Sequence, residues 1–171
     1  IDRRRLGNEP EATLFCALKT EKNDGAKYIP QLIDRGVHAF VLTQEQYAGI
    51  AGVGSGDTII VVEDVLVALQ QLAAYKRSLY QGPVIGITGS NGKTVVKEWL
   101  YQLLKEDYHI TRSPKSYNSQ IGVPLSVWQL NEQTELAIFE AGISEMGEMA
   151  RLQPMIRPTI GVITYIGTEH G

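Results

Sequence analysis

After residue 82 the sequence alternates between short apolar runs and amphipathic segments, and this alternation restricts the fold more than any other feature. Strands are predicted at residues 84–88, 108–111, 136–140 and 159–164. A helix is predicted over residues 95–105, with an inward face made of Val96, Trp99, Leu100, Leu103 and Leu104. Strands that alternate with helices at this pitch predict a parallel sheet with right-handed crossover connections.

The first 82 residues form a second, smaller pattern. Helical spacing starts near residue 26 and ends at Gly36, and apolar strands are predicted at residues 37–42 and 59–62. A further helix runs from an N-cap at Asp64 to about residue 80. The segment Gln81-Gly82-Pro83 then interrupts the pattern. The sequence therefore predicts two α/β domains, residues 1–82 and 83–171, the second built on a parallel sheet.

Composition excludes several classes of protein. With 43% hydrophobic and 20% charged residues in 171, the chain can bury a core and is not a disordered protein. A net charge of −3 argues against a broad cationic surface for nucleic acid or anionic lipid. Since no run approaches the ~20 apolar residues of a membrane span, we expect no membrane insertion.

The cysteine content and the two ends of the sequence carry further expectations. Cys16 is the single cysteine, which fits a reducing compartment, and we expect a cytoplasmic protein with Cys16 as a buried apolar side chain. The chain begins without Met and stops at His170-Gly171, so we expect a piece of a longer protein.

One strand-to-helix junction predicts a phosphate-binding loop, Gly86-Ile87-Thr88-Gly89-Ser90-Asn91-Gly92-Lys93-Thr94. Glycines let backbone N–H groups surround an anion, and the helix N-terminus adds positive charge. Lys93 is placed to neutralise phosphates, and Thr94 to bring a hydroxyl to Mg²⁺. The general P-loop pattern requires glycine at position 87, where this chain has Ile87. The alternative interpretation is a tight turn with a solvated lysine.

Two further residues follow predicted strands at the same edge of the sheet. Glu140 ends the strand 136–140, and His170 follows the strand 159–164. The carboxyl ends of parallel strands open onto the ligand crevice, where a carboxylate can hold Mg²⁺ bound to phosphates. Taken alone, Glu140 at the end of a strand is more readily interpreted as facing solvent, and a lone histidine is weak evidence for a metal.

The departure at Ile87 is part of a resemblance. The string 88–94 resembles the ATP-binding loop of the Mur ligases, which build the peptide stem of bacterial cell-wall precursors. Residues 116–125 are similar to a loop of the branch that adds D-alanyl-D-alanine to UDP-N-acetylmuramoyl-tripeptide; they read Ser116-Tyr117-Asn118-Ser119-Gln120-Ile121-Gly122-Val123-Pro124-Leu125. Upstream, Asp2-Arg3-Arg4, the run 14–19 and Asp24-Gly25 resemble the domain that holds the UDP end of the substrate.

The resemblance implies roles for individual residues. Nucleotide contacts are implied for Gly89, Ser90, Asn91, Gly92, Lys93, Thr94 and Asn118. Metal ligands are implied at Thr94, Glu140 and His170, and catalytic roles at Lys93, Glu140 and His170. Substrate contacts are implied for Asp2, Arg4, Lys19, Asp24 and Gly25. The cofactors implied are ATP and Mg²⁺, and some family members also carry a fused alanine racemase domain.

These observations leave several functions open. The first is an ATP-dependent amide-forming ligase that works through an acyl phosphate, of which this chain is an incomplete and inactive part. The second is a non-catalytic module that binds a UDP-sugar and a nucleotide. A sibling Mur ligase that adds a different residue is a third. An unrelated P-loop NTPase is a fourth, and it explains neither Ile87 nor the loop around Asn118.

Overall fold

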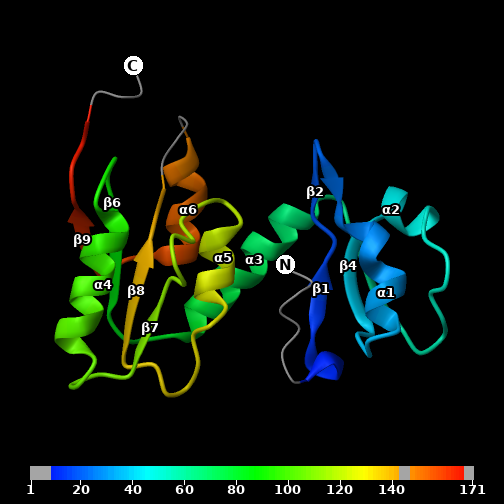
Figure 1. Cartoon of the computed structure of the whole chain (residues 1–171), viewed down its shortest axis with the longest axis horizontal. Coiled ribbons are helices and arrows are strands. Elements are labelled where there is room, and N and C mark those ends of the chain that lie inside the picture. The colour runs from blue at the N-terminus through cyan, green and yellow to red at the C-terminus, as the bar shows by residue number, and fades with distance from the viewer. Residues whose placement is uncertain (1–8, 143–146, 168–171) are drawn as a thin grey trace. The chain divides into compact units, whose positions relative to one another are not determined.

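The computed structural model describes residues 9–142 and 147–167 of the chain. The chain divides into two compact units, Ile1–Leu69 (unit 1) and Gln70–Gly171 (unit 2). Both units are α/β, and unit 2 is built on a parallel sheet, as the sequence predicted; unit 1 also contains a parallel sheet, which was not predicted (Figure 1). No helix in the described ranges is long and apolar enough to cross a bilayer.

Unit 1 contains a three-stranded parallel sheet in the order β1-β4-β5, formed by β1 (Leu14–Cys16), β4 (Ala39–Thr43) and β5 (Thr58–Val62). Between β1 and β4 lie a hairpin of β2 (Lys19–Thr20) and β3 (Asn23–Asp24), a 3₁₀ turn η3 (Gly25–Tyr28) and α1 (Ile29–Ile33). A short turn η2 (Pro10–Ala12) precedes β1, and α2 (Gln44–Ala48) follows β4. The strands β4 and β5 confirm the predicted runs 37–42 and 59–62.

One hydrophobic cluster forms the core of unit 1. It joins Phe15 and Phe40 of the sheet to Ile29 and Leu32 of α1, and the two phenylalanine rings meet edge to face. Cys16 is buried beside this cluster, and burial raises the pKa of its thiol. The expectation that Cys16 is a buried apolar side chain is therefore confirmed.

The two units divide within α3 (Val65–Leu79), whose first turn is capped by Asp64 as predicted: the Asp64 carboxylate accepts from Val67 N–H at 3.0 Å. The second half of α3 packs into unit 2, where Ala73 lies in the core and the Arg77 guanidinium binds the Ile156 carbonyl. The boundary predicted at residue 82, between a substrate-binding and an ATP-binding domain, stays a prediction. The two compact units divide earlier, inside α3, between Leu69 and Gln70.

Unit 2 is a four-stranded parallel sheet in the order β7-β8-β6-β9 (Figure 1). Its strands are β6 (Val84–Thr88), β7 (Ile110–Arg112), β8 (Leu136–Glu140) and β9 (Ile160–Ile163). The connecting helices are α4 (Lys93–Leu104), α5 (Gly122–Val127) and α6 (Glu148–Ile156). The bounds of β6 and β8 are those predicted from the sequence.

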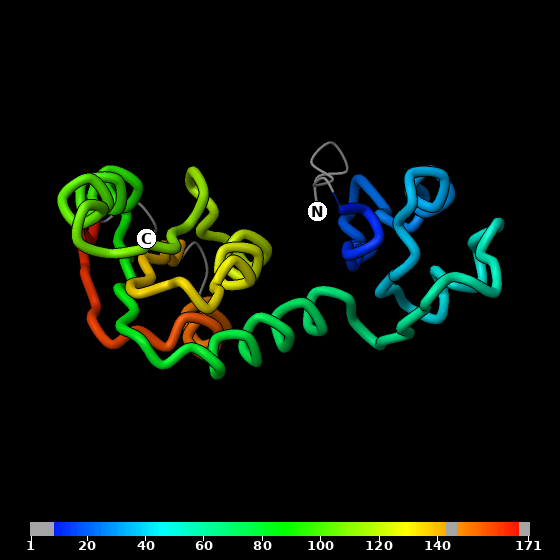
Figure 2. The backbone as a smooth tube through the Cα atoms, turned by 90° about the horizontal axis from the view of Figure 1, so that it is seen from below, coloured from blue at the N-terminus to red at the C-terminus, as the bar shows by residue number. Residues whose placement is uncertain are grey.

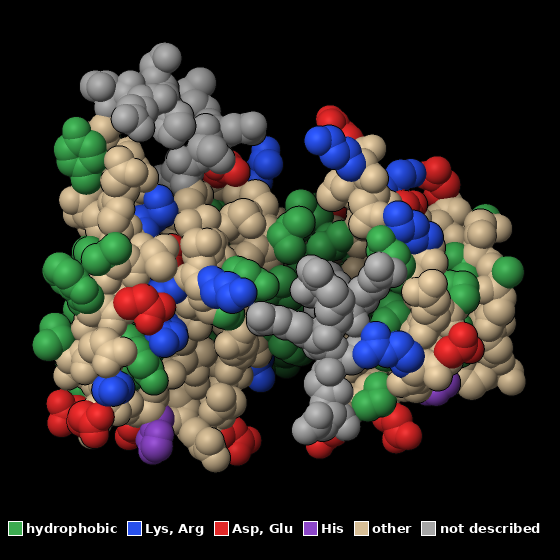
Figure 3. Space-filling view, in the orientation of Figure 1, with side chains coloured by type: hydrophobic (Ala, Val, Ile, Leu, Met, Phe, Trp, Pro, Cys, Tyr) green, Lys and Arg blue, Asp and Glu red, His purple; other side chains and the backbone are tan. Residues whose placement is uncertain are grey.

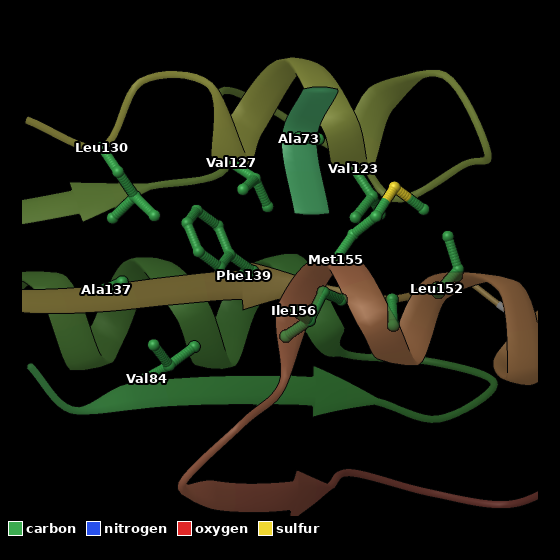
Figure 4. Close-up of a cluster of buried hydrophobic side chains, with 11 residues drawn as sticks. Ala73, Val84, Val123, Val127, Leu130, Ala137, Phe139, Leu152, Met155 and Ile156 are labelled. Atoms are coloured by element: carbon green, nitrogen blue, oxygen red, sulfur yellow. The ribbon is translucent and has the colours of Figure 1, made fainter. Parts of the chain in front are cut away.

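The two faces of this sheet carry different helices, and α4 and α6 lie on opposite sides of the strands (Figure 2). On the face of α6, Phe139 packs with Val84, Val127, Leu152 and Met155 (Figure 4). On the other face, Val96, Leu100 and Leu104 of α4 cover Ile85, Ile87 and Ile138. Because β6 leads into the helix on one face and β8 leads toward the helix on the other, their carboxyl ends form a topological switch point, the place where open α/β sheets bind ligands.

The predicted inward face of α4 was partly wrong. Val96, Leu100 and Leu104 face the sheet, but Trp99 and Leu103 are 68% and 74% exposed, and hydrophobic side chains show on the surface over α4 (Figure 3). The position between Val96 and Trp99 is the one that is fully buried, and it holds Lys97.

Candidate nucleotide and magnesium site

The loop between β6 and α4 has a backbone that only glycine accommodates easily. Gly89 has φ +131°, and a Cβ there would lie 2.4 Å from Thr164 Oγ1. Gly92 has φ +83° and is the N-cap of α4, so no side chain caps the first turn. The N–H groups at the start of α4 are therefore not satisfied by a capping side chain, as an anion site requires.

The end of β9 braces this loop. Thr164 Oγ1 donates to Asn91 O at 2.5 Å, Gly167 N–H donates to Ser90 Oγ at 3.0 Å, and Ser90 N–H donates to Tyr165 O at 2.6 Å. Two of these contacts involve Ser90, one through its hydroxyl and one through its N–H. The loop conformation thus depends on residues 164–167, which directly follow β9 and are far from the loop in sequence. No local sequence pattern could reveal these contacts.

The side chain of Lys93 folds back onto the loop that precedes it. Its ammonium donates to Gly89 O at 2.5 Å, so the positive charge is already at the centre of the loop. A phosphate that enters this loop would meet both the ammonium and the N–H groups of the first turn of α4.

Glu140 is the buried carboxylate of the site. It ends β8 beside Ile87 in the sheet register, and its side chain is fully buried. Thr94 Oγ1 donates to Glu140 Oε2 at 3.0 Å, and Asn118 Nδ2 lies 3.4 Å from the same oxygen. Three residues that the sequence placed in one site are therefore brought together from α4, β8 and the loop before α5.

Asn118 is fixed in place by its backbone as well. Gly142 N–H donates to Asn118 O at 2.7 Å, and a Cβ at Gly142 would lie 2.9 Å from Asn118 Oδ1. Glycine at position 142 therefore lets the chain after β8 pass close to this loop.

The donor set fits Mg²⁺. The Thr94 hydroxyl and the Glu140 carboxylate offer oxygen ligands beside a phosphate loop, and Mg²⁺ is usually bound by one or two carboxylates, water and substrate phosphates. In residues 9–142 and 147–167, no cluster of three or more His, Cys, Asp or Glu could hold a metal without such additional ligands. His170, the other predicted metal ligand, lies outside the described residues.

Sequence reasoning missed Lys97. Its ammonium lies 2.9 Å from Glu140 Oε1, and both side chains are fully buried. The same ammonium donates to the carbonyls of Ser113 and Lys115. The signal available was its position one turn after Lys93, on the same face of α4.

The predicted substrate residues of unit 1 gather around α2. Lys19 Nζ lies 3.3 Å from Glu45 Oε1, and Asp24 Oδ1 accepts from Gln46 Nε2 at 2.7 Å and from Ala26 N–H at 2.9 Å. Gly25 approaches the backbone closely, since a Cβ there would lie 2.9 Å from Leu18 O. Asp2 and Arg4 lie outside the described residues.

A cavity of about 290 Å³ adjoins these residues. Its lining includes Asp24, Lys27, Glu45 and Gln46. The residues predicted to contact the substrate are thus partly brought together, and one of the two contacts of Asp24, that with Ala26 N–H, caps η3.

Comparison with known proteins identifies the family of the segment that carries this site. Residues 87–171 match the model of the Mur ligase middle domain. The UDP-N-acetylmuramoyl-tripeptide--D-alanyl-D-alanine ligases of a Synechocystis strain and of Bacillus subtilis are each 38% identical over 92% of this chain. The chain spans about a third of their length, 34% of each.

Solved structures give the same relationship. The MurF ligase of Thermotoga maritima in complex with ADP superposes with a TM-score of 0.78 at 31% identity, covering 94% of this chain and 36% of that one. MurF of Acinetobacter baumannii gives a TM-score of 0.78 at 29% identity over 89% of this chain and 32% of that one. Since the matched segment starts at Ile87 in β6 and the relatives align on both units, this chain belongs to the Mur ligase family.

Proposed function

We propose that this chain is the part of a ligase that binds UDP-N-acetylmuramoyl-tripeptide and ATP, in an enzyme that joins D-alanyl-D-alanine to that tripeptide. The observation that carries the proposal is the convergence of Thr94, Glu140 and Asn118 beside the phosphate loop. These residues come from separate elements, so their meeting is a property of the fold. The names of the relatives support the choice of substrates.

The proposed reaction has two steps. A carboxylate oxygen of the tripeptide attacks the γ-phosphorus of ATP; the bond from that phosphorus to the β,γ-bridging oxygen breaks, and ADP leaves. The product is an acyl phosphate. The amine of D-alanyl-D-alanine then attacks the acyl carbon and loses a proton, and inorganic phosphate leaves as the amide forms.

The residues of the loop supply binding and electrostatic stabilisation rather than covalent chemistry. Lys93 and the N–H groups at the start of α4 hold the phosphates while negative charge moves between oxygens. Thr94 and Glu140 would hold Mg²⁺, which offsets the repulsion between phosphates and the entering carboxylate. We extend the metal site to His170, and nucleotide contacts to Gly89, Ser90, Asn91 and Gly92.

The substrate is assigned to the first part of the chain, residues 1–82, with contacts from Asp2, Arg4, Lys19, Asp24 and Gly25. Lys19 and Asp24 are register partners in the β2-β3 hairpin, and an exposed lysine there can pair with a diphosphate. We place the reaction in the cytoplasm, where ATP is supplied.

Binding of the substrate by this chain tests the proposal. Isothermal titration should give measurable affinity for UDP-N-acetylmuramoyl-tripeptide and weaker affinity for the UDP-N-acetylmuramoyl-dipeptide that a sibling ligase would use. Tighter binding of the dipeptide would favour the sibling. Absence of binding to both, in a chain that is folded by circular dichroism, would contradict the assignment of the substrate to residues 1–82.

A further inference from the structure

A lysine that the proposed reaction does not use lies at the centre of the site. Lys97 follows Lys93 by one turn of α4, and its side chain is fully buried. Removing a charged ammonium from water is costly unless nearby oxygens compensate it. The contacts of Lys97 therefore indicate which interactions compensate the free energy of burying its ammonium.

Lys97 joins two segments that are far apart in sequence. Its ammonium donates to Ser113 O at 2.8 Å and to the Lys115 carbonyl, and it lies 2.9 Å from Glu140 Oε1. Glu98 Oε1 lies 3.2 Å away at the rim. The oxygens around one ammonium thus come from the segment before Asn118, from β8 and from α4 itself.

The segment that Lys97 holds has a backbone that needs support. Lys115 has φ +51°, in the left-handed region that a lysine rarely adopts. Its carbonyl is one of the two that Lys97 binds. Three residues later the same segment places Asn118 beside Glu140. A change at Lys97 would thus reach both Asn118 and Glu140.

We propose that Lys97 is a positioning residue: it fixes the Glu140 carboxylate with Oε2 toward Thr94, and it fixes the segment 113–118 that carries Asn118. This inference rests on the proposed nucleotide and Mg²⁺ site. Because Lys97 takes Oε1, the other oxygen remains beside the Thr94 hydroxyl. Its charge also offsets that of Glu140 beside the phosphate loop, so that a nucleotide does not meet an uncompensated carboxylate.

The clamp on segment 113–118 is tested without any ligand. Lys115 is exposed, so trypsin can cut after it when the segment opens. In Lys97→Met, trypsin should cleave the Lys115–Ser116 bond about tenfold faster or more. Mass spectrometry of the products measures the rate. The control is Lys105→Met, since Lys105 is exposed after α4 and its ammonium lies 3.9 Å from Glu106 Oε1. Equal cleavage rates in Lys97→Met and wild type would overturn the proposal.

A second variant separates the clamp from the stability of the fold. Lys97→Met leaves Glu140 buried without its cation, which alone could destabilise the unit. In Lys97→Met with Glu140→Gln both charges are removed. We expect this double variant to melt close to wild type. Trypsin should nevertheless cut it after Lys115 faster than it cuts wild type. Slow cleavage in the folded double variant would contradict the role of Lys97.

The effect on the metal site is measured as a ratio. For each protein, the affinity for ADP is determined with Mg²⁺ and with EDTA. In Lys97→Met the gain in affinity that Mg²⁺ gives should fall by about tenfold, while the affinity in EDTA stays near that of wild type. An unchanged gain overturns this inference and leaves the proposed function standing. If wild type itself gains nothing from Mg²⁺, the proposed metal site fails, and the inference fails with it.

Discussion

The Thr94 hydroxyl donates to Glu140 Oε2 at 3.0 Å, which links the first turn of α4 to the last residue of β8. These two oxygens approach each other because β6 and β8 are neighbours in the sheet and Ile87 pairs with Glu140. The link defines where a cation would sit between the protein and a phosphate.

Removing the Thr94 hydroxyl should weaken binding only when Mg²⁺ is present. Thr94→Val keeps the shape of the side chain but loses the oxygen, and we expect the affinity for Mg-ADP to fall about tenfold, or ~1.4 kcal/mol. Thr94→Ser keeps the oxygen and is the matched control, with an expected change within about twofold. Isothermal titration measures both, and equal losses in the two variants would argue against a ligand role for the hydroxyl.

Gly89→Ala should damage the loop. The new Cβ would lie 2.4 Å from Thr164 Oγ1 at a residue with φ +131°, so the loop and the end of β9 must separate. We expect destabilisation by about 1–3 kcal/mol in urea unfolding and loss of ADP affinity. Gly56→Ala is the control, since nothing lies within 4 Å of its Cβ position. Wild-type stability in Gly89→Ala would contradict the loop geometry.

Arg77 should be a stability residue of unit 2. Its guanidinium donates to Ile156 O and Arg157 O at 2.7 Å and to Tyr80 O at 2.8 Å. Burial lowers the pKa of Arg77, yet three carbonyls compensate the charge. Arg77→Met leaves those carbonyls without a partner and should cost about 2–4 kcal/mol in urea unfolding. The exposed Arg151 gives the control, Arg151→Met, for which no loss is expected.

The same contacts predict where unit 2 can be cut. A fragment that starts at residue 70 keeps Ala73 in the core and keeps Arg77, whereas one that starts at residue 83 loses both. We expect the fragment 70–171 to melt cooperatively and the fragment 83–171 to be markedly less stable. Equal melting temperatures would contradict the division inside α3.

Unit 1 should show a pH dependence that comes from Asp57. The His38 ring at 2.8 Å and the Gly54 N–H at 2.7 Å hold the pKa of Asp57 below its ordinary value. A lowered pKa means that the stabilisation is present above about pH 4 and is lost as the pH falls through the lowered pKa. Wild type should melt higher than Asp57→Asn at pH 7, and the gap should close at low pH. A gap that widens on acidification would contradict this assignment.

The sequence predicted the parts of the fold that depend on local patterns. The bounds of β6 and β8 follow from continuous apolar runs, and the loop 89–94 follows from its glycines and Lys93. The short elements of unit 1, β1, the β2-β3 hairpin and α2, are too brief for periodicity to reveal. Their bounds are set by pairing and packing rather than by pattern.

The central residue that was missed illustrates a different limit. An apolar pattern on α4 placed Trp99 inward, whereas the side that is most buried contains Lys97. A lysine is stable there only because Glu140 and two carbonyls come from later parts of the chain. Helical periodicity carries no information about such partners.

The most direct test of the account is the binding of Mg-ADP to this chain with and without Lys93. Thermal unfolding should give equal melting temperatures for wild type, Lys93→Ala and the surface control Lys105→Ala, and isothermal titration then gives the affinity of each protein for Mg-ADP. We predict that the affinity falls at least about tenfold in Lys93→Ala alone, since Lys93 Nζ lies within the loop, bound to Gly89 O. Unchanged affinity in a folded Lys93→Ala variant would contradict the assignment of residues 89–94 as the nucleotide site.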